Sequence, residues 1–318
     1  MKYTFSPCYL AFFCWLFFAF AACTPATDGT EHATARAASA FGTPLLLSGE
    51  PSSSGIVLQA RLQATDTLVN GDLPGAEGFA RFVVAPTADF AEATTTEWLP
   101  ATPENDFIVK EKISGLASGS TFFYKLEYGK EKVAENTSEQ QSFNTLQANN
   151  STDSLSFVMV TGSHYERFYH GRNMGKDVAA DKMRRLPLST EDSLRGFPGL
   201  ESIMALQPDF YIGNGDNVYY DHAPDNSYAR AVPELRAKWH RQFHLPRFRE
   251  LFAQVPTVWL KDDHDYRWDD ADTLNQNELH GTLPSHQTGK EIFLEQVPLA
   301  ESPEEARTYR TMRLNRHL

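Results

Sequence analysis

Cysteine is nearly absent from this sequence. The chain of 318 residues contains only Cys8, Cys14 and Cys23, and all three lie in the first 23 residues. A chain without that segment has no thiol for a disulfide, a thiolate nucleophile or a metal ligand. Its stability must come from a packed core, and any metal site must use oxygen and nitrogen donors.

Basic residues are also scarce. The chain has 29 Lys and Arg against 41 Asp and Glu, a net charge of −12. It therefore lacks the basic footprint of a nucleic-acid-binding protein, and we expect no such partner. The sequence also contains no HExxH, GxSxG, P-loop or CxxC motif. It therefore gives no support for a zinc protease, a serine hydrolase, a P-loop nucleotide-binding protein or a CxxC redox protein.

The N-terminus predicts export. Residues 1–23 read MKYTFSPCYLAFFCWLFFAFAAC, in which Lys2 is the only charge and the apolar run is short for a membrane span. The ending FAAC is similar to a bacterial lipobox, with Phe20 in place of the usual leucine. We expect lipidation of Cys23 and a location in the cell envelope, in the periplasm or on the cell surface. An ordinary signal peptide and an uncleaved anchor are the alternatives. Residues 24–43 are small and polar and predict a flexible tether.

Residues 44–146 show a period of two. Apolar residues alternate with their neighbours in two stretches, at Ile56, Leu58, Ala60 and Leu62 and at Phe122, Tyr124, Leu126 and Tyr128. Turn-forming segments such as GDLPG, ATPEND and GLASGS separate these short strands. The pattern predicts an all-β sandwich of the immunoglobulin or fibronectin III type.

Residues 155–318 begin with strands that alternate with helices. LSFVMVTG, PDFYIGNGD and VPTVWLKDDHD are typical of buried strands, and FPGLESIMALQ and PELRAKWHRQFHLPRFRELFAQ of helices. Leu235, Trp239 and Phe243 form one apolar stripe, and Pro246 is expected to kink or split the second helix. This order predicts right-handed crossovers and a largely parallel sheet.

Polar residues follow each of these strands, in TGSHYE, NGDNVYYDH and KDDHDYRWDD. Because sites form at the carboxyl ends of parallel strands, we expect the three loops to meet. Asp216 and Asp263 would converge there as metal ligands, and His264 would protonate a leaving group. Two metal ions at such a site can clamp a phosphoryl group. A solvated acidic loop is the alternative for Lys261–Asp272, which holds six aspartates.

Two motifs carry a resemblance to a known family. GNGDNVYYD resembles the GDxxY element of PhoD-type alkaline phosphatases and phosphodiesterases, and VWLKDDHD resembles that family's WDDHE element. The preceding sandwich and the later SHQTGKEIFLEQVPL and TYRTMRL also fit the family's order. By this resemblance Asp216 bridges two metal ions and Tyr219 binds Fe(III) as a phenolate. Asp263 then binds the second ion, often Ca(II), and His264 acts on the leaving group.

The chain departs from the family in two respects. Gly162 stands at the position of the family's ligating cysteine, so Ser163 or His164 is the expected replacement. The family also has a further half domain with a late metal motif. The resemblance therefore implies an incomplete αββα sandwich, an α/β metallophosphoesterase layer preceded by the all-β domain and truncated at its C-terminus.

We therefore expect an exported, metal-dependent hydrolase of phosphomonoesters or phosphodiesters that uses a metal-bound hydroxide. Its partners would be a phosphate ester and, through the lipid anchor, a membrane. Within the acidic stretch, Asp262 and Asp265 are expected to support the ligands, and Asp269–Asp272 to be a solvated loop. The alternatives are a truncated, non-catalytic fragment and a calcium-binding surface lipoprotein.

Overall fold

The computed structural model describes residues 40–170, 188–221, 228–273, 284–299, 307–309 and 311–316. The predicted signal segment with Cys23, and most of the predicted tether, lie outside these residues. None of the helices in the described ranges is long and apolar enough to cross a membrane.

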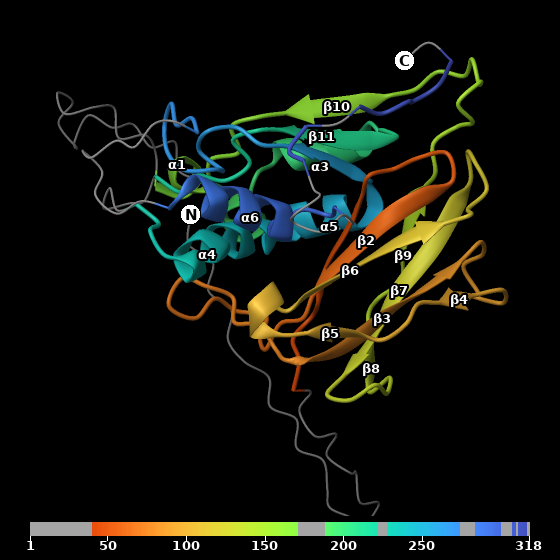
Figure 1. The fold of residues 1–318 in the computed structure, drawn as a ribbon, viewed down its shortest axis with the longest axis horizontal. Coiled ribbons are helices and arrows are strands. Elements are labelled where there is room, and N and C mark those ends of the chain that lie inside the picture. Colours follow the sequence, from red (N-terminus) through yellow and green to blue (C-terminus); the bar gives the residue numbers. More distant parts are fainter. Residues whose placement is uncertain are drawn as a thin grey trace, which may run out of the picture. The chain divides into compact units, whose positions relative to one another are not determined.

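Two β-sheets organise the described residues (Figure 1). The first has the strand order β10-β11-β12-β1-β2-β6, and the second has the order β4-β3-β7-β8, with β5 paired to β3 and β9 to β7. The strands are β1 Leu45–Gly49, β2 Gly55–Arg61, β3 Gly78–Ala85, β4 Thr94–Thr95, β5 Leu99–Ala101, β6 Ile108–Ser114, β7 Thr121–Gly129, β8 Asn136–Thr137, β9 Gln141–Asn144, β10 Phe157–Val160, β11 Phe210–Asn214 and β12 Thr257–Leu260. The helices are η1 Pro103–Asn105, α1 Tyr165–His170, α2 Thr190–Arg195, α3 Gly199–Ala205, α4 Val232–Phe243, α5 Pro246–Gln254 and α6 His286–Gln296.

The strands β10, β11 and β12 pair in parallel, as the alternation of strands and helices predicted. The predicted break in the second helix also occurs, since α4 ends at Phe243 and α5 begins at Pro246. Proline has no N–H to continue the helical hydrogen bonds, which explains the break. The ring of Phe243 packs on Trp239 of the same helix and on Trp259 of β12, so the apolar stripe of α4 faces the sheet.

The first sheet continues into the N-terminal region. Gly49 of β1 pairs in parallel with Thr257 of β12, and the Glu50 amide donates to the Thr257 carbonyl at 3.0 Å. The Thr257 hydroxyl donates in turn to the Ser48 carbonyl at 2.8 Å. A shared sheet therefore joins the two regions that the sequence divides at residues 146–155, and residues 39–318 form one compact unit.

Strand β2 is buried on both faces. Ile56, Leu58 and Ala60 belong to the core of the sandwich, as the period of two indicated. Gln59 and Arg61 are also buried, although this period is typical of a strand with one exposed face. At Gln59 the partner is α6, because Gln59 Nε2 donates to the carbonyl of Gln296 at 2.8 Å. Arg61 instead bonds to two loop residues, the Leu73 carbonyl at 2.9 Å and the Asp106 carboxylate at 3.2 Å.

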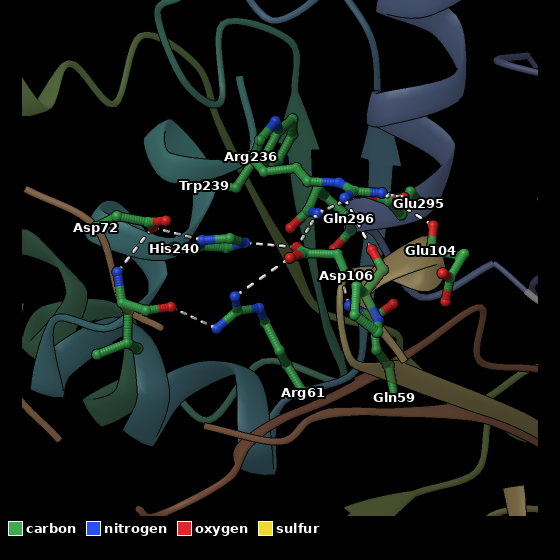
Figure 2. A network of polar contacts seen from close by, with 12 residues as sticks. Gln59, Arg61, Asp72, Glu104, Asp106, Arg236, Trp239, His240, Glu295 and Gln296 are labelled. Atoms are coloured by element: carbon green, nitrogen blue, oxygen red, sulfur yellow. Dashed lines mark hydrogen bonds and ion pairs between the residues drawn. The ribbon is translucent and has the colours of Figure 1, made fainter. Parts of the chain in front are cut away.

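A buried polar network ties loops of the sandwich to α4 and α6 (Figure 2). His240 lies between two carboxylates, with Nδ1 2.7 Å from Asp72 Oδ1 and Nε2 2.5 Å from Asp106 Oδ2. Asp106 also accepts from Arg61 at 3.2 Å and from Gln296 at 2.7 Å. Burial acts to raise the pKa of Asp106, but His240, Arg61 and Gln296 hold it well below its usual range. Asp106 is therefore the buried anion around which the network is built.

Candidate metal centre

The ends of the three parallel strands lie side by side. Val160 of β10 pairs with Gly213 of β11, and Asn214 of β11 pairs with Leu260 of β12. The Thr161 hydroxyl donates to the Gly215 carbonyl at 3.0 Å, which joins the first two loops. The three polar loops thus start from one edge of the sheet.

Asp216 lies in a turn that favours glycine. Gly215 has φ +79° and Asp216 has φ +52°, in the left-handed region where a non-glycine residue is strained. A Cβ on Gly215 would lie 2.5 Å from Asp262 Cβ, so the glycine allows the β11 and β12 loops to approach closely. Asp216 Oδ2 accepts a hydrogen bond from the Tyr219 hydroxyl at 2.9 Å.

Tyr219 packs between two histidines. Its ring centroid is 3.9 Å from that of His164, nearly parallel, and 4.4 Å from that of His264. Gly162 has φ +74°, and a Cβ there would lie 3.7 Å from the Tyr219 hydroxyl oxygen. The neighbouring Tyr220 instead faces the core, where its hydroxyl accepts from Trp239 at 2.7 Å. This arrangement favours Tyr219 over Tyr220 as a site residue.

Within the residues that the structure describes, two groups of side chains can hold a cation. Asp216, Asp263 and His264 offer ligand atoms within 4.8 Å of one another, and so do Asp263, Asp269 and Asp270. The structure therefore brings Asp216 and Asp263 together from two strands, with Asp263 shared by both groups. Asp269 and Asp270 are exposed, as expected of a solvated loop, yet they lie beside the predicted ligands.

The donor set fits a metal ion. Asp216 Oδ1 is buried and has no hydrogen-bond partner in the described part of the chain. Burial raises the pKa of Asp216, and the charges of Asp263 and Asp262 raise it further. The hydrogen bond from Tyr219 and the charge of His264 act to lower it. A cation would supply the missing partner of Oδ1 and neutralise the gathered carboxylates. Carboxylate donors suit a hard or intermediate ion.

His264 is held by Asp221. Its Nδ1 lies 2.8 and 2.9 Å from the two Asp221 oxygens, and its Nε2 lies 3.4 Å from Asp269 Oδ1. Burial acts to lower the pKa of His264, but the hydrogen bond and charge of Asp221, with Asp216 and Asp263, raise it to about 9. The imidazole is therefore protonated at neutral pH and has a proton to donate.

Asp265 connects the β11 and β12 loops. It is fully buried, and its carboxylate accepts from the Asn217 amide at 3.0 Å and from the Asp262 amide at 2.8 Å. Desolvation raises the pKa of Asp265 to about 7, although these hydrogen bonds act to lower it. Its contacts fit the prediction that it supports the ligands, because both partners adjoin a predicted ligand in the sequence.

Sequence reasoning missed Asp221 and two cations of α4, Lys238 and Arg241, that lie near Tyr219. A signal for Asp221 was present, since it follows Asp216 by five residues in the same polar loop. The apolar stripe predicted that α4 packs on the core, but it did not predict that Lys238 and Arg241 lie near the site. Most of the arginine-rich stretch 165–188 lies outside the described residues.

Comparison with known proteins agrees with this architecture. Residues 28–147 match the family model of the PhoD-like phosphatase N-terminal domain. The solved structure of PhoD is similar with a TM-score of 0.62 and 17% identity, over 86% of this chain and 50% of that chain. The structure of purple acid phosphatase PPD1 from yellow lupin (Lupinus luteus) seeds has a TM-score of 0.49 and 15% identity, over 84% of this chain and 42% of that chain. No curated protein matches the chain.

The chain spans half the length of the PhoD chain that it matches. At 17% identity this similarity shows the fold, and the family model covers the N-terminal region. Together they confirm the predicted resemblance to PhoD-type phosphatases and the predicted fold class.

Proposed function

We propose that this chain, whose N-terminal region matches the PhoD-like phosphatase model and whose fold is similar to that of PhoD, hydrolyses phosphomonoesters or phosphodiesters with bound metal ions. The observation that carries the proposal is the buried Asp216 Oδ1, which has no hydrogen-bond partner in the described residues and lies in a cluster with Asp263 and His264. An acidic cluster is a poor site for an anionic ester unless cations bind there first.

The residues that would hold two metal ions are Asp216, Tyr219 and Asp263, with His164 as the fourth candidate. By the resemblance the ions are Fe(III) and Ca(II), and they would supply Lewis-acid charge and lower the pKa of a water molecule. Burial and the charge of Asp216 hold the pKa of Tyr219 above its usual range, so its hydroxyl keeps the proton that it donates to Asp216. That proton must leave when Tyr219 binds a metal ion as a phenolate.

His264 is the proton donor of the proposed reaction. Asp221 binds its Nδ1, which fixes the ring orientation and leaves Nε2 as the nitrogen for the substrate side. A protonated Nε2 can transfer its proton to the oxygen of the departing alcohol or phenol, which would otherwise leave as an alkoxide or phenolate. The hydrogen bond and the charge of Asp221 favour the protonated form of the His264 ring, against burial.

The test uses 4-nitrophenyl phosphate and bis(4-nitrophenyl) phosphate with added iron and calcium. We expect Asp216→Asn and Asp263→Asn each to lower turnover at least about a hundredfold, because each removes a charged ligand. Asp89→Asn is the matched control, since Asp89 is an exposed carboxylate of the sandwich that bonds to Thr87. Turnover unchanged by either ligand substitution contradicts the proposal.

The second cluster supports calcium binding as an alternative function. Asp263, Asp269 and Asp270 form a group whose last two members are exposed, which is typical of weak calcium sites. A calcium-binding surface protein would gain thermal stability with calcium and show no hydrolysis of either substrate under any metal condition. Hydrolysis that depends on Asp216 decides against it.

Export and a lipid anchor at Cys23 remain part of the proposal and rest on the FAAC ending of the apolar segment. In a bacterial host, an alkyne fatty acid should label the wild-type chain, and Cys23→Ser should remove the label and release the protein from membranes. Labelling that persists in Cys23→Ser refutes the assignment.

A further inference from the structure

Asn217 directly follows the candidate ligand Asp216 and is almost fully buried, at 5% exposure. Its backbone amide donates to the carboxylate of Asp265 at 3.0 Å, and its side-chain Nδ2 donates to the same carboxylate at 2.5 Å. Nδ2 also donates to the carbonyl of Leu260, the last residue of β12, at 2.9 Å. Asn217 therefore joins the loop that carries Asp216 to the end of the neighbouring strand.

Helix α4 also holds Asn217. Gln242, at 1% exposure, donates from Nε2 to the Asn217 carbonyl. Trp239 of the same helix donates to the Tyr220 hydroxyl at 2.7 Å, so α4 contacts the loop at two residues. Buried hydrogen bonds of this kind restrict the loop, because breaking one leaves a polar group without a partner where water is excluded.

Strand β11 leaves room for the Asn217 side chain. A Cβ on Gly213 would lie 2.6 Å from Asn217 Oδ1 and 2.4 Å from the ring of Trp259. Both distances are far below an ordinary van der Waals contact. Glycine at position 213 therefore allows the amide of Asn217 to lie against the strand, where Nδ2 reaches the carbonyl of Leu260.

These contacts act one residue away from a strained ligand. Asp216 has φ +52°, and a non-glycine residue keeps such a backbone only where its surroundings fix it. Its carboxylate must also reach Asp263, from another strand, since the two offer ligand atoms within 4.8 Å of each other. Ligands of a functional site must be held to within about 0.5 Å of their productive positions. The contacts of Asn217 supply that restraint for Asp216.

We propose that Asn217 and Gln242 are positioning residues of the metal centre, which hold Asp216 in its left-handed conformation so that its carboxylate meets Asp263. Both act through Asp216. The inference rests on the proposed function and goes beyond the support expected from the acidic neighbours of the ligands, because it assigns part of the ligand geometry to helix α4. The competing explanation is that the hydrogen bonds of Asn217 and Gln242 only stabilise the fold.

The test measures Ca²⁺ binding by isothermal titration calorimetry, well below the Tm of each variant, where every protein is folded. We expect Gln242→Met to raise the Kd for Ca²⁺ at least about tenfold, the lower end of the range for losing a residue that orients a ligand. Methionine has a similar length and no hydrogen-bond donor, so the substitution removes the bond to the Asn217 carbonyl and keeps the packing. Asn217→Ala, which removes the contacts of Nδ2, should act in the same direction.

Asp216→Asn identifies the Ca²⁺ binding to which this comparison applies. Asp263, Asp269 and Asp270 form a second candidate group that does not include Asp216. Binding that Asp216→Asn removes or weakens is therefore the binding expected to depend on Gln242. Equal binding by the wild type and Asp216→Asn overturns the proposal, because Asp216 would then have no ion to position.

The matched control is Gln59→Met in strand β2. Gln59 is 2% exposed and donates from Nε2 to a backbone carbonyl, that of Gln296, at 2.8 Å, in the network of Figure 2. Gln59→Met therefore removes the same kind of buried bond from a contact that contains no candidate ligand. Its Tm should decrease as that of Gln242→Met does, whereas its Kd for Ca²⁺ should stay within about twofold of the wild-type value.

A merely structural role predicts wild-type Kd values in all folded variants. An unchanged Kd in Gln242→Met overturns the proposal, and so does an equal increase in Gln59→Met. If Asn217→Ala does not fold, Gln242→Met still decides. The result is also separate from turnover: a wild type that binds Ca²⁺ but hydrolyses neither nitrophenyl ester loses the proposed function, while the Kd values still decide the role of Asn217 and Gln242.

Discussion

Substitution of Asp106 by Asn tests whether the buried network of Figure 2 couples the sandwich to the helical layer. Asp106 is 3% exposed and binds Arg61, His240 and Gln296. Asn has nearly the same size, and it tolerates the left-handed backbone at this position, where φ is +53°. The substitution therefore removes the charge and leaves the shape unchanged.

The expected loss in the free energy of unfolding is about 3 kcal/mol, the lower end of the range for breaking a buried ion pair from one side. The lower end applies because the Asn oxygen still accepts one hydrogen bond. For a compact unit of this size, that loss corresponds to a decrease in Tm of roughly 6 to 12 °C. Asp89→Asn, which removes an exposed carboxylate, is expected to change stability by less than about 0.5 kcal/mol.

Calorimetry and urea unfolding measure the effect, and pH provides an independent check. The pKa of Asp106 in the folded state lies below its unfolded value. Its contribution to stability is therefore present above the unfolded pKa and is lost as pH falls through the folded pKa. The wild type should lose more stability between neutral and acidic pH than Asp106→Asn does. A stability change below about 1 kcal/mol, or equal acid sensitivity of the two proteins, refutes the reasoning.

Three further predictions concern the candidate centre and the sheet edge. The activity that needs protonated His264 should fall at high pH. Asp221→Asn should move this fall to lower pH in a pH–rate profile, because Asp221 raises the His264 pKa. An unshifted profile contradicts the pairing. His264→Asn should slow hydrolysis of phenyl phosphate more than that of 4-nitrophenyl phosphate, since the better leaving group needs less protonation; equal losses argue against an acid role. Met159→Lys should reduce concentration-dependent association of the protein in sedimentation experiments. The reason is that Met159 and Phe157 are apolar side chains on the edge strand β10, 56% and 44% exposed. Unchanged association would show that the chains do not associate through β10.

The strand ends were predictable because their signal is local. Each parallel strand is a short apolar run that ends abruptly in Asp, His or Gly, and the carboxyl ends of such strands must share an edge. Asp216 and Asp263 were therefore placed together without any knowledge of the distance between them. The division at Pro246 was predictable for the same reason, since the missing N–H acts within one helical turn.

The shared sheet was not predictable from the pattern. The pairing of Gly49 with Thr257 spans about two hundred residues and uses backbone groups, which carry no residue-specific signal. The double burial of β2 follows from it, because the joined sheet brings α6 over Gln59. A period of two reports that one face of a strand is apolar, and polar residues on the other face can be buried once a helix supplies hydrogen-bond partners.

The residues around His264 and Tyr219 show a second limit of sequence reasoning. A carboxylate that orients a histidine can come from any element, so Asp221 was visible only as one acid among several in its loop. Lys238 and Arg241 belong to α4, a helix that its apolar stripe alone predicts. A charged residue beside such a stripe is usually solvated. Both are largely buried beside Glu166, and burial is a property of the folded chain. The candidate ligands of the centre could thus be named from the sequence, whereas Asp221, the partner of His264, needed the structure.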